Sequence, residues 1–105
     1  MYNSKKIIGS DEIEEIKNAA VHLRAMDNPL RLEILDIIWE NNNLMAVSQL
    51  CRRMNIVQSV VSGHLAILRK SQLVNIKREG KFIYYSVNLK RTDQIFHLFR
   101  QMNRF

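Results

Sequence analysis

Cysteine, proline and glycine are scarce in this sequence of 105 residues, and each shortage excludes a class of structure. One cysteine, Cys51, allows neither an internal disulfide nor a metal cage built from several thiolates. One proline and three glycines leave no flexible linker, so we expect residues 1–105 to fold as a single domain. No apolar run exceeds four residues, which is too short to span a bilayer.

The first ten residues also lack the apolar stretch of a secretory signal, so we expect no export signal there. Together with the shortage of cysteine, this points to a cytoplasmic protein. Hydrophobic residues make up 47% of the chain and charged residues 25%, which is the composition of a globular domain and not of a disordered segment.

Acidic residues are scarce in the second half of the chain. Residues 51–105 carry eleven Lys and Arg against only Glu79 and Asp93, whereas residues 1–50 carry five against eight acidic residues. The net charge is therefore +9 in one half and −3 in the other, within a total of +6. This asymmetry favours one surface directed at a polyanion, either nucleic acid or a membrane surface.

Hydrophobic spacing predicts five helices. Capping signals mark the first two starts, namely Asp11 with Glu14, and Asn28 followed by Pro29. The third helix begins at Ala46 and is short. The expected ranges are about 11–25, 29–40, 46–55, 57–71 and 91–104.

After Leu73 the apolar period changes from helical to two. The alternation surrounds the turn Arg78-Glu79-Gly80-Lys81 and predicts an antiparallel β-hairpin. Phe82, Tyr84 and Tyr85 could form a base-stacking platform, but at this period we interpret them as strand core. The expected fold class is mainly α with a small antiparallel β-hairpin: a winged helix-turn-helix of about five helices plus the wing.

The third and fourth predicted helices form the helix-turn-helix pattern. Leu50, Cys51, Ile56, Val61 and Leu65 lock this pair together and leave short polar side chains free to enter a major groove. Ser and Gln suit that position because they bond base edges without holding the two backbones apart. The basic hairpin that follows is the wing, which can lie along an adjacent groove or the phosphate backbone.

Four parts of the chain resemble the ArsR-type winged-helix repressors. They are Asn28-Pro29-Leu30-Arg31-Leu32-Glu33-Ile34-Leu35, Gln58-Ser59-Val60-Val61-Ser62-Gly63-His64-Leu65, Leu68-Arg69 with Leu73-Val74, and Arg78-Glu79-Gly80-Lys81-Phe82-Ile83-Tyr84-Tyr85. The resemblance covers about residues 27–88, in family order and at family spacing. It implies a cytoplasmic bacterial homodimer that binds a near-palindromic operator in double-stranded DNA and releases it when an inducer binds.

The resemblance also implies which residues contact DNA, on the fourth helix and the wing. These residues are Gln58, Ser59, Ser62, Gly63, His64, Arg69, Arg78 and Lys81. Three positions depart from the family pattern: Val57 stands where Ser often caps the fourth helix, Ala46 stands where Thr or Ser commonly starts the third, and Gly63 replaces a larger polar or basic residue. Gly63 either permits close approach of the backbone to phosphate or is simply tolerated.

Apolar stripes on the first and last helices predict the dimer interface, because a small domain built on the second to fourth helices cannot cover both. The residues of this interface are Ile13, Ile16, Ala20, Leu23, Ile95, Phe96, Phe99 and Met102. Burying them against a symmetry mate would set the two recognition helices about 34 Å apart, which is one turn of DNA.

No metal or cofactor is expected. Cys51 lacks a second thiol nearby, so we interpret it as a small side chain packed between helices, with a redox or ligand role as the alternative because two arginines flank it. Asp93 and His97 lie one helical turn apart, and a solvated pair is favoured over a zinc site shared across a dimer. His22 has no evident partner, and the sequence does not identify an inducer.

An enzyme and a module that binds a protein or RNA are the two alternatives to a DNA-binding regulator. An enzyme is not expected, because the sequence shows no nucleophile–base pair and no phosphate-binding glycine loop. The alternative is a winged-helix module that binds a protein or RNA. The segment from Gln58 to Gln72 contains no carboxylate, which favours nucleic acid over a protein partner.

Overall fold

The computed structural model describes residues 10–102, and residues 1–9 and 103–105 lie outside that description. The expectation that residues 1–10 hold no export signal therefore falls almost entirely outside the described residues. Within the described residues the chain forms five helices and a small antiparallel sheet, which confirms the expected fold class. In chain order the elements are α1 (Ser10–Met26), α2 (Pro29–Glu40), β1 (Met45–Ala46), α3 (Val47–Met54), α4 (Gln58–Lys70), β2 (Val74–Glu79), β3 (Phe82–Val87) and α5 (Leu89–Met102).

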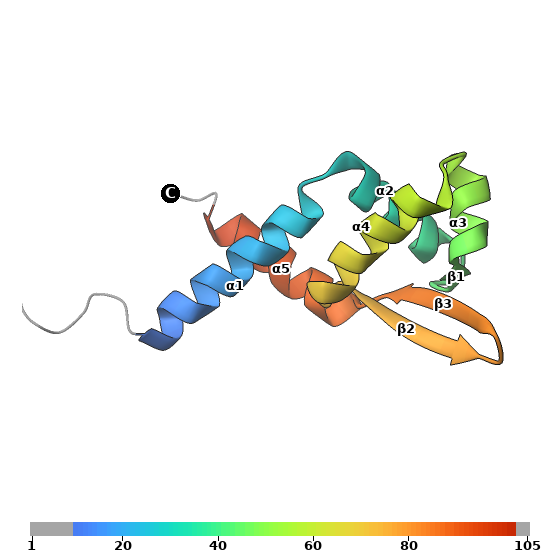
Figure 1. Ribbon diagram of the computed structural model, residues 1–105. Helices are drawn as coiled ribbons and strands as arrows, with labels where there is room; N and C mark the ends of the chain where they lie inside the picture. The colour runs from blue at the N-terminus through green and yellow to red at the C-terminus, as the bar shows by residue number, and fades with distance from the viewer. Residues whose placement is uncertain (1–9, 103–105) are drawn as a thin grey trace, which may run out of the picture.

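The molecule has a compact body and a two-helix extension (Figure 1). Helices α2, α3 and α4 and the sheet make up the body, while α1 and α5 pack side by side and project from it. None of the described helices is long and apolar enough to cross a membrane.

Helix ends follow the capping chemistry of the sequence. The side-chain oxygen of Asn28 accepts hydrogen bonds from the backbone N–H groups of Leu30 and Arg31, at 3.0 and 3.2 Å, so the predicted start of α2 is confirmed. Helix α3 ends at Asn55, which has a φ of 54° in the left-handed region. Val57 precedes α4 without any side-chain cap, as expected.

The sequence did not predict the strand β1 or the exact start of α5. The strand β1 pairs with β3 through Met45 opposite Tyr85, giving the sheet order β1-β3-β2, and a two-residue strand is too short to leave a period in the sequence. Helix α5 begins at Leu89 and not near residue 91, because the side chain of Asn88 accepts the N–H of Arg91 at 3.2 Å and caps the helix.

The hairpin closes with a two-residue loop between Glu79 and Phe82. Gly80 takes a φ of +61° there, a conformation that L side chains rarely adopt. The interpretation of all three wing aromatics as strand core is wrong for Phe82, which is 53% exposed beside the loop. Tyr85 does pack against the core, because the alternation of the strand turns it to the other face.

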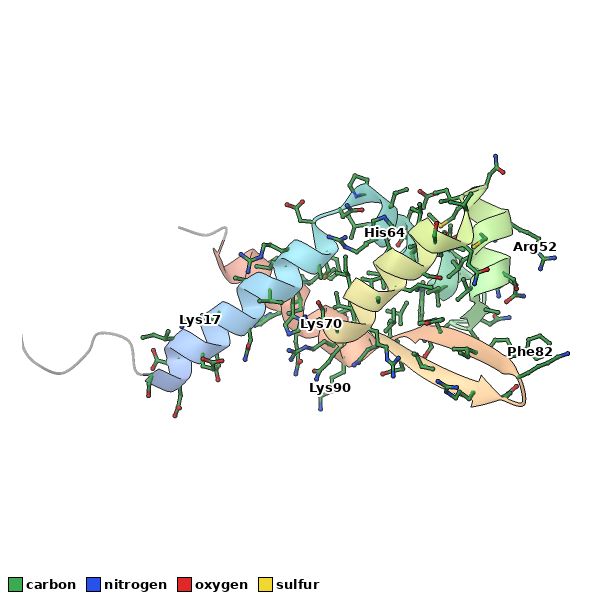
Figure 2. All side chains as sticks on the ribbon, in the orientation of Figure 1. Lys17, Arg52, His64, Lys70, Phe82 and Lys90 are labelled. Carbon is green, nitrogen blue, oxygen red and sulfur yellow. The ribbon has the colours of Figure 1, made fainter. Side chains whose placement is uncertain are left out.

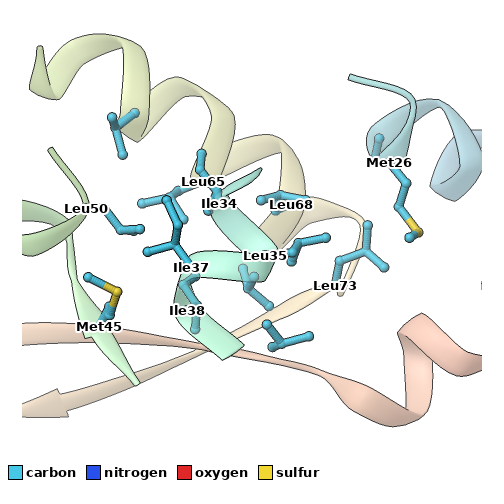
Figure 3. Packing of buried hydrophobic residues seen from close by; sticks show 14 of the residues in the cluster. Met26, Ile34, Leu35, Ile37, Ile38, Met45, Leu50, Leu65, Leu68 and Leu73 are labelled. Carbon is cyan, nitrogen blue, oxygen red and sulfur yellow. The ribbon is translucent and has the colours of Figure 1, made fainter. Parts of the chain in front are cut away.

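The hydrophobic core lies where α2 meets α4, and Figure 3 shows Ile34 of α2 beside Leu65 and Leu68 of α4. Leu50 of α3 is fully buried in the same cluster, while Cys51 is half-buried and packs against it. The predicted locking of α3 to α4 is therefore confirmed. The larger fully buried side chains are Ile34, Ile38, Leu50, Leu65, Leu68, Leu73 and Val61.

Asn43 ties the end of α2 to the sheet. Its side-chain oxygen accepts the N–H of Val87 at 2.7 Å, and its amide donates to the carbonyl of the same residue at 3.3 Å. Asn43 adopts a left-handed φ of 55°, as does its neighbour Asn42 with a φ of 59°. The sequence marked this asparagine run only as a helix end, whereas one of its members joins backbone groups 44 residues away.

We expect Asn43→Ala to lower the free energy of unfolding by about 1–3 kcal/mol more than Asn42→Ala, because only the first leaves backbone groups of Val87 without partners. Both substitutions place alanine in the left-handed region, so the control carries the same backbone cost. Chemical denaturation of the two variants measures the difference. Equal destabilisation would show that the Asn43 side chain contributes nothing beyond its backbone conformation.

His22 is not isolated, contrary to the expectation from the sequence. Its ring is buried, with 7% of the residue exposed, and its Nε2 receives a hydrogen bond from Nη2 of Arg91 on α5. Burial and the adjacent guanidinium lower the pKa of His22 below its ordinary 6.5, and the nearby backbone of Ser71 acts in the opposite direction. A neutral imidazole therefore bridges the two helices.

The lowered pKa of His22 predicts a pH-dependent stability. Below the ordinary pKa of about 6.5 the unfolded chain binds a proton at His22 that the folded chain resists, so the free energy of unfolding falls as the pH falls. The slope from this residue should not exceed about 1.4 kcal/mol per pH unit. Denaturation at several pH values should give a shallower acid decline for His22→Gln. Parallel curves would contradict a neutral His22 in the fold.

Candidate nucleic-acid interface

Helix α4 is held by one face and exposes the other. Val61, Leu65 and Leu68 bury the inner face, and the turn from Asn55 to Val57 sets α4 across the end of α3. Ile56 in that turn packs against the core. The outer face therefore points away from the body as a consequence of core packing.

The outer face carries small and polar side chains. By helical geometry Ser59, Gly63 and Ala66 lie opposite the buried stripe, and all three are exposed. Gln58 is exposed at the N-terminal end, whereas Ser62 is half-buried on the flank. A Cβ at Gly63 would meet no atom within 4 Å, so nothing in the described protein requires glycine there. Small side chains on this face let the helix backbone approach a groove closely.

His64 is engaged inside the protein. Its Nδ1 lies 3.4 Å from Nη1 of Arg31, whose guanidinium also donates to the carbonyl of Arg24 at 3.1 Å and to that of Ala25. Arg31 thereby joins the C-terminal end of α1, the start of α2 and the middle of α4. Figure 2 shows His64 on the side of α4 that faces the α1–α2 connection.

The wing presents charge at its tip. Arg78 and Lys81 are exposed, and Nζ of Lys81 lies 5.7 Å from the centre of the Phe82 ring. Lys77 is paired with Glu79 at 3.1 Å, so its charge is partly compensated. Of the wing cations, the two predicted from the sequence are the ones that no carboxylate of the described residues neutralises.

Other cations surround α4. Arg69 and Lys70 are exposed in its last turn, and Arg52 is exposed on α3. Figure 2 shows Arg52 on the outer side of α3 and Phe82 at the end of the hairpin, both at the end of the molecule away from α1. Arg53 faces Glu40 at 3.7 Å.

The predicted interface residues on α1 and α5 divide into two groups. Ile95 is 2% exposed and Leu23 packs against the core, so both already serve the single chain. Ile13 and Phe96 remain exposed, and Ala20 is half-buried. The side chains of the other three predicted residues lie outside the description: Ile16, Phe99 and Met102.

Asp93 and His97 are both exposed on α5. Among the described residues no group of three or more His, Cys, Asp or Glu side chains could hold a metal ion.

The sequence did not predict that two apolar side chains at the start of α4 would be exposed. Val57 is 66% exposed and Val60 is 41% exposed, on either side of Gln58 and Ser59. Val60 lies outside the spacing of the buried stripe formed by Val61, Leu65 and Leu68, which is the signal that could have identified it. An exposed valine at this end of a recognition helix is suited to contact a thymine methyl group.

Comparison with known proteins gives a consistent picture. Residues 28–75 match the family described as bacterial regulatory protein, arsR family. The chain is 33% identical over 84 residues to the transcriptional activator HlyU of Vibrio cholerae, covering 80% of this chain and 76% of that protein. The crystal structure of NolR from Sinorhizobium fredii superposes with a TM-score of 0.71 at 33% identity, covering 95% of each chain. The transcriptional repressor PagR of Bacillus anthracis gives 0.70 at 31%, covering 83% of this chain and 99% of that one.

We expect Val60→Ala to remove recognition of a single thymine methyl group. With the wild-type protein, replacing thymine by uracil at the contacted position of a bound duplex should weaken binding roughly fivefold, as expected for one buried methyl group. With Val60→Ala, the same replacement should have no effect. Ile67→Ala is the control, since Ile67 is similarly exposed two turns further along α4. If uracil weakens binding equally in both variants, Val60 does not read the methyl group.

Proposed function

Because this chain belongs to the arsR family of bacterial regulatory proteins, we propose that it is a homodimeric repressor that binds a near-palindromic operator. DNA-binding transcriptional regulation is the function of the family. The proposal concerns how this chain carries it out: as a single winged helix-turn-helix domain that acts on double-stranded DNA in the cytoplasm. An effector of unknown identity releases the operator.

The exposed N-terminal end of α4 carries the proposal. Gln58 and Ser59 project there, Val57 leaves the first N–H groups of the helix without a side-chain cap, and no acidic residue occupies the first turn. Uncapped N–H groups at a helix N-terminus suit contact with a phosphate or a base edge. The exposed side of α4 has no carboxylate, which favours nucleic acid over a protein as its partner.

Reading and positioning fall to different residues in this proposal. Gln58, Ser59 and Ser62 contact base edges, since Gln can pair bidentately with adenine. Gly63 allows close approach, and Arg69, Arg78 and Lys81 contact phosphates. His64 acts through its contact with Arg31, which holds α4 at its angle to α1.

The dimer would be built by α1 and α5. Ile13 and Phe96 remain exposed on these helices, as does Val21 at 48%. Apolar residues exposed on two adjacent helices favour burial against a second copy. A two-fold axis through the projecting pair would direct the two α4 helices to half-sites about 34 Å apart.

We expect Gln58→Ala to lower affinity for the operator by about 1–3 kcal/mol while leaving binding to random duplex nearly unchanged, because a base contact is lost. Lys81→Ala should weaken binding to both duplexes and reduce the slope of log affinity against log salt by about one, because a phosphate contact is lost. Titration of both duplexes at several salt concentrations measures the two effects.

The contrast between these variants tests the function itself. Equal weakening of both duplexes by Gln58→Ala would mean that α4 is not the reading element. A salt-independent affinity in the wild type would favour the alternative, a winged-helix module for a protein partner, and tighter binding to RNA than to any duplex DNA would favour an RNA-binding module.

We expect Phe96→Glu to shift the dimer toward monomer, because it places a carboxylate in an apolar interface. Lys90→Glu is the control, since Lys90 is exposed on another face of α5. Sedimentation over a range of protein concentrations measures the change. The monomeric variant should also lose about the affinity of one half-site. An unchanged dimer would place the interface elsewhere.

A further inference from the structure

A polar groove lies between α1 and α5, the two helices that project from the body in Figure 1. It encloses about 380 Å³, within the range of small-molecule sites. Glu15, Asn18 and His22 line it from α1, and Arg91 and Gln94 line it from α5. Ile95 and His97 complete the wall. Packed helices ordinarily bring apolar side chains together, so the polar and charged residues among those that line the groove require another explanation.

The groove holds a cation without a counter-ion. Among the described residues no carboxylate forms an ion pair with Arg91, and its buried Nε–H has no hydrogen-bond acceptor. Its one side-chain partner is His22, a neutral imidazole whose own Nδ1 is buried and without a hydrogen-bond partner. Arg91 is half-buried, and its guanidinium has a buried Nε–H without an acceptor and no carboxylate partner among the described residues, so an anion would complete its contacts.

We propose that this groove binds a small organic acid, with its carboxylate on Arg91, and that this acid is the effector of the regulator. The assignment of an effector role rests on the function proposed above. The planar guanidinium matches a carboxylate in geometry as well as in charge. The amides of Asn18 and Gln94 supply further hydrogen bonds, and the side chain of Ile95 supplies an apolar contact for the body of the acid.

Glu15 sets the polarity of the groove. It lies seven residues before His22 on α1, which is about 10 Å along the helix axis. An acid bound at Arg91 therefore keeps its carboxylate at the end of the groove nearest the body. Near Glu15 the acid would carry a neutral or hydrogen-bond-donating group, because a second carboxylate there would be repelled.

The groove is connected to the DNA-reading helix. The ring of His22 lies beside the backbone of Ser71, which follows the last turn of α4. Asn88, the residue that caps α5, donates from its side chain to the carbonyl of Gln72 at 3.0 Å and from its backbone to that of Leu73 at 2.9 Å. An acid that draws Arg91 away from His22 therefore acts on the start of α5, which Asn88 ties to the segment after α4. It shifts DNA affinity if the bound and free conformations of α4 hold it unequally.

Binding is tested first, without DNA. Benzoate, succinate and inorganic phosphate are titrated separately into the full chain at constant ionic strength, with thermal unfolding as the readout. We expect saturable stabilisation by a carboxylate in the millimolar range or below, and at least tenfold weaker binding in Arg91→Gln. Lys90→Gln is the matched control, because it removes the same charge from the neighbouring residue. Asn18→Trp fills the groove and leaves Arg91 and His22 intact, so it should also abolish binding.

The outcomes separate the site from the function. Stabilisation that is equal in Arg91→Gln and Lys90→Gln, or absent with both carboxylates, would overturn the site. Phosphate binding as tightly as the carboxylates would overturn the choice of an organic acid. If a carboxylate binds at Arg91 but leaves operator affinity unchanged, the effector role fails while DNA binding stands. A wild-type chain that binds carboxylate but no DNA would contradict the proposed function and not the groove.

Discussion

The apolar contact between α2 and α4 is the constraint on which the rest of this structure depends. Ile34 and Ile38 meet Leu65 and Leu68 there, all fully buried, and Leu50 adds α3 to the same cluster. Close-packed side chains of this kind define one orientation of a helix, because a rotation would open cavities. The polar side of α4 is exposed because its apolar side must pack against α2 and α3 to be buried.

Long-range polar contacts then decide how the remaining elements meet this core. Asn43 joins the end of α2 to β3, and Asn88 joins the start of α5 to the segment after α4. Arg31 links α1, α2 and α4 through two carbonyls and His64. Each of these side chains hydrogen-bonds backbone groups of another element, which helps to satisfy those groups within the fold. Together these contacts join the two-helix extension, α1 and α5, to α4.

Charge divides the molecule along the same line as its architecture. The helix-turn-helix and wing carry exposed cations with few carboxylates nearby, whereas the outer part of α1 is acidic. A phosphate backbone is therefore attracted to the end of the molecule that holds α4 and the hairpin. At the other end, the uncompensated guanidinium of Arg91 lies in a groove too small for a nucleic acid. The cations around α4 and the hairpin thus suit a large polyanion, whereas Arg91 suits a small anion.

The sequence by itself determined the five helices and the hairpin of this protein and the polar face of α4, although it did not predict the strand β1. Periods of 3.6 and 2 distinguish the helices from the hairpin, Asn28 and Asn55 mark helix ends, and the buried stripe of α4 implies its polar face. These are local properties, which depend on neighbours a few residues apart. Only the tertiary structure decided that Asn43 bonds Val87, that His22 meets Arg91, and that Phe82 is exposed while Tyr85 is packed. The two hydrogen bonds depend on which distant residues the packed core brings together, and no spacing along the chain encodes that. The alternation of the strand separates Phe82 from Tyr85, but only the packed core shows which of its two faces is covered.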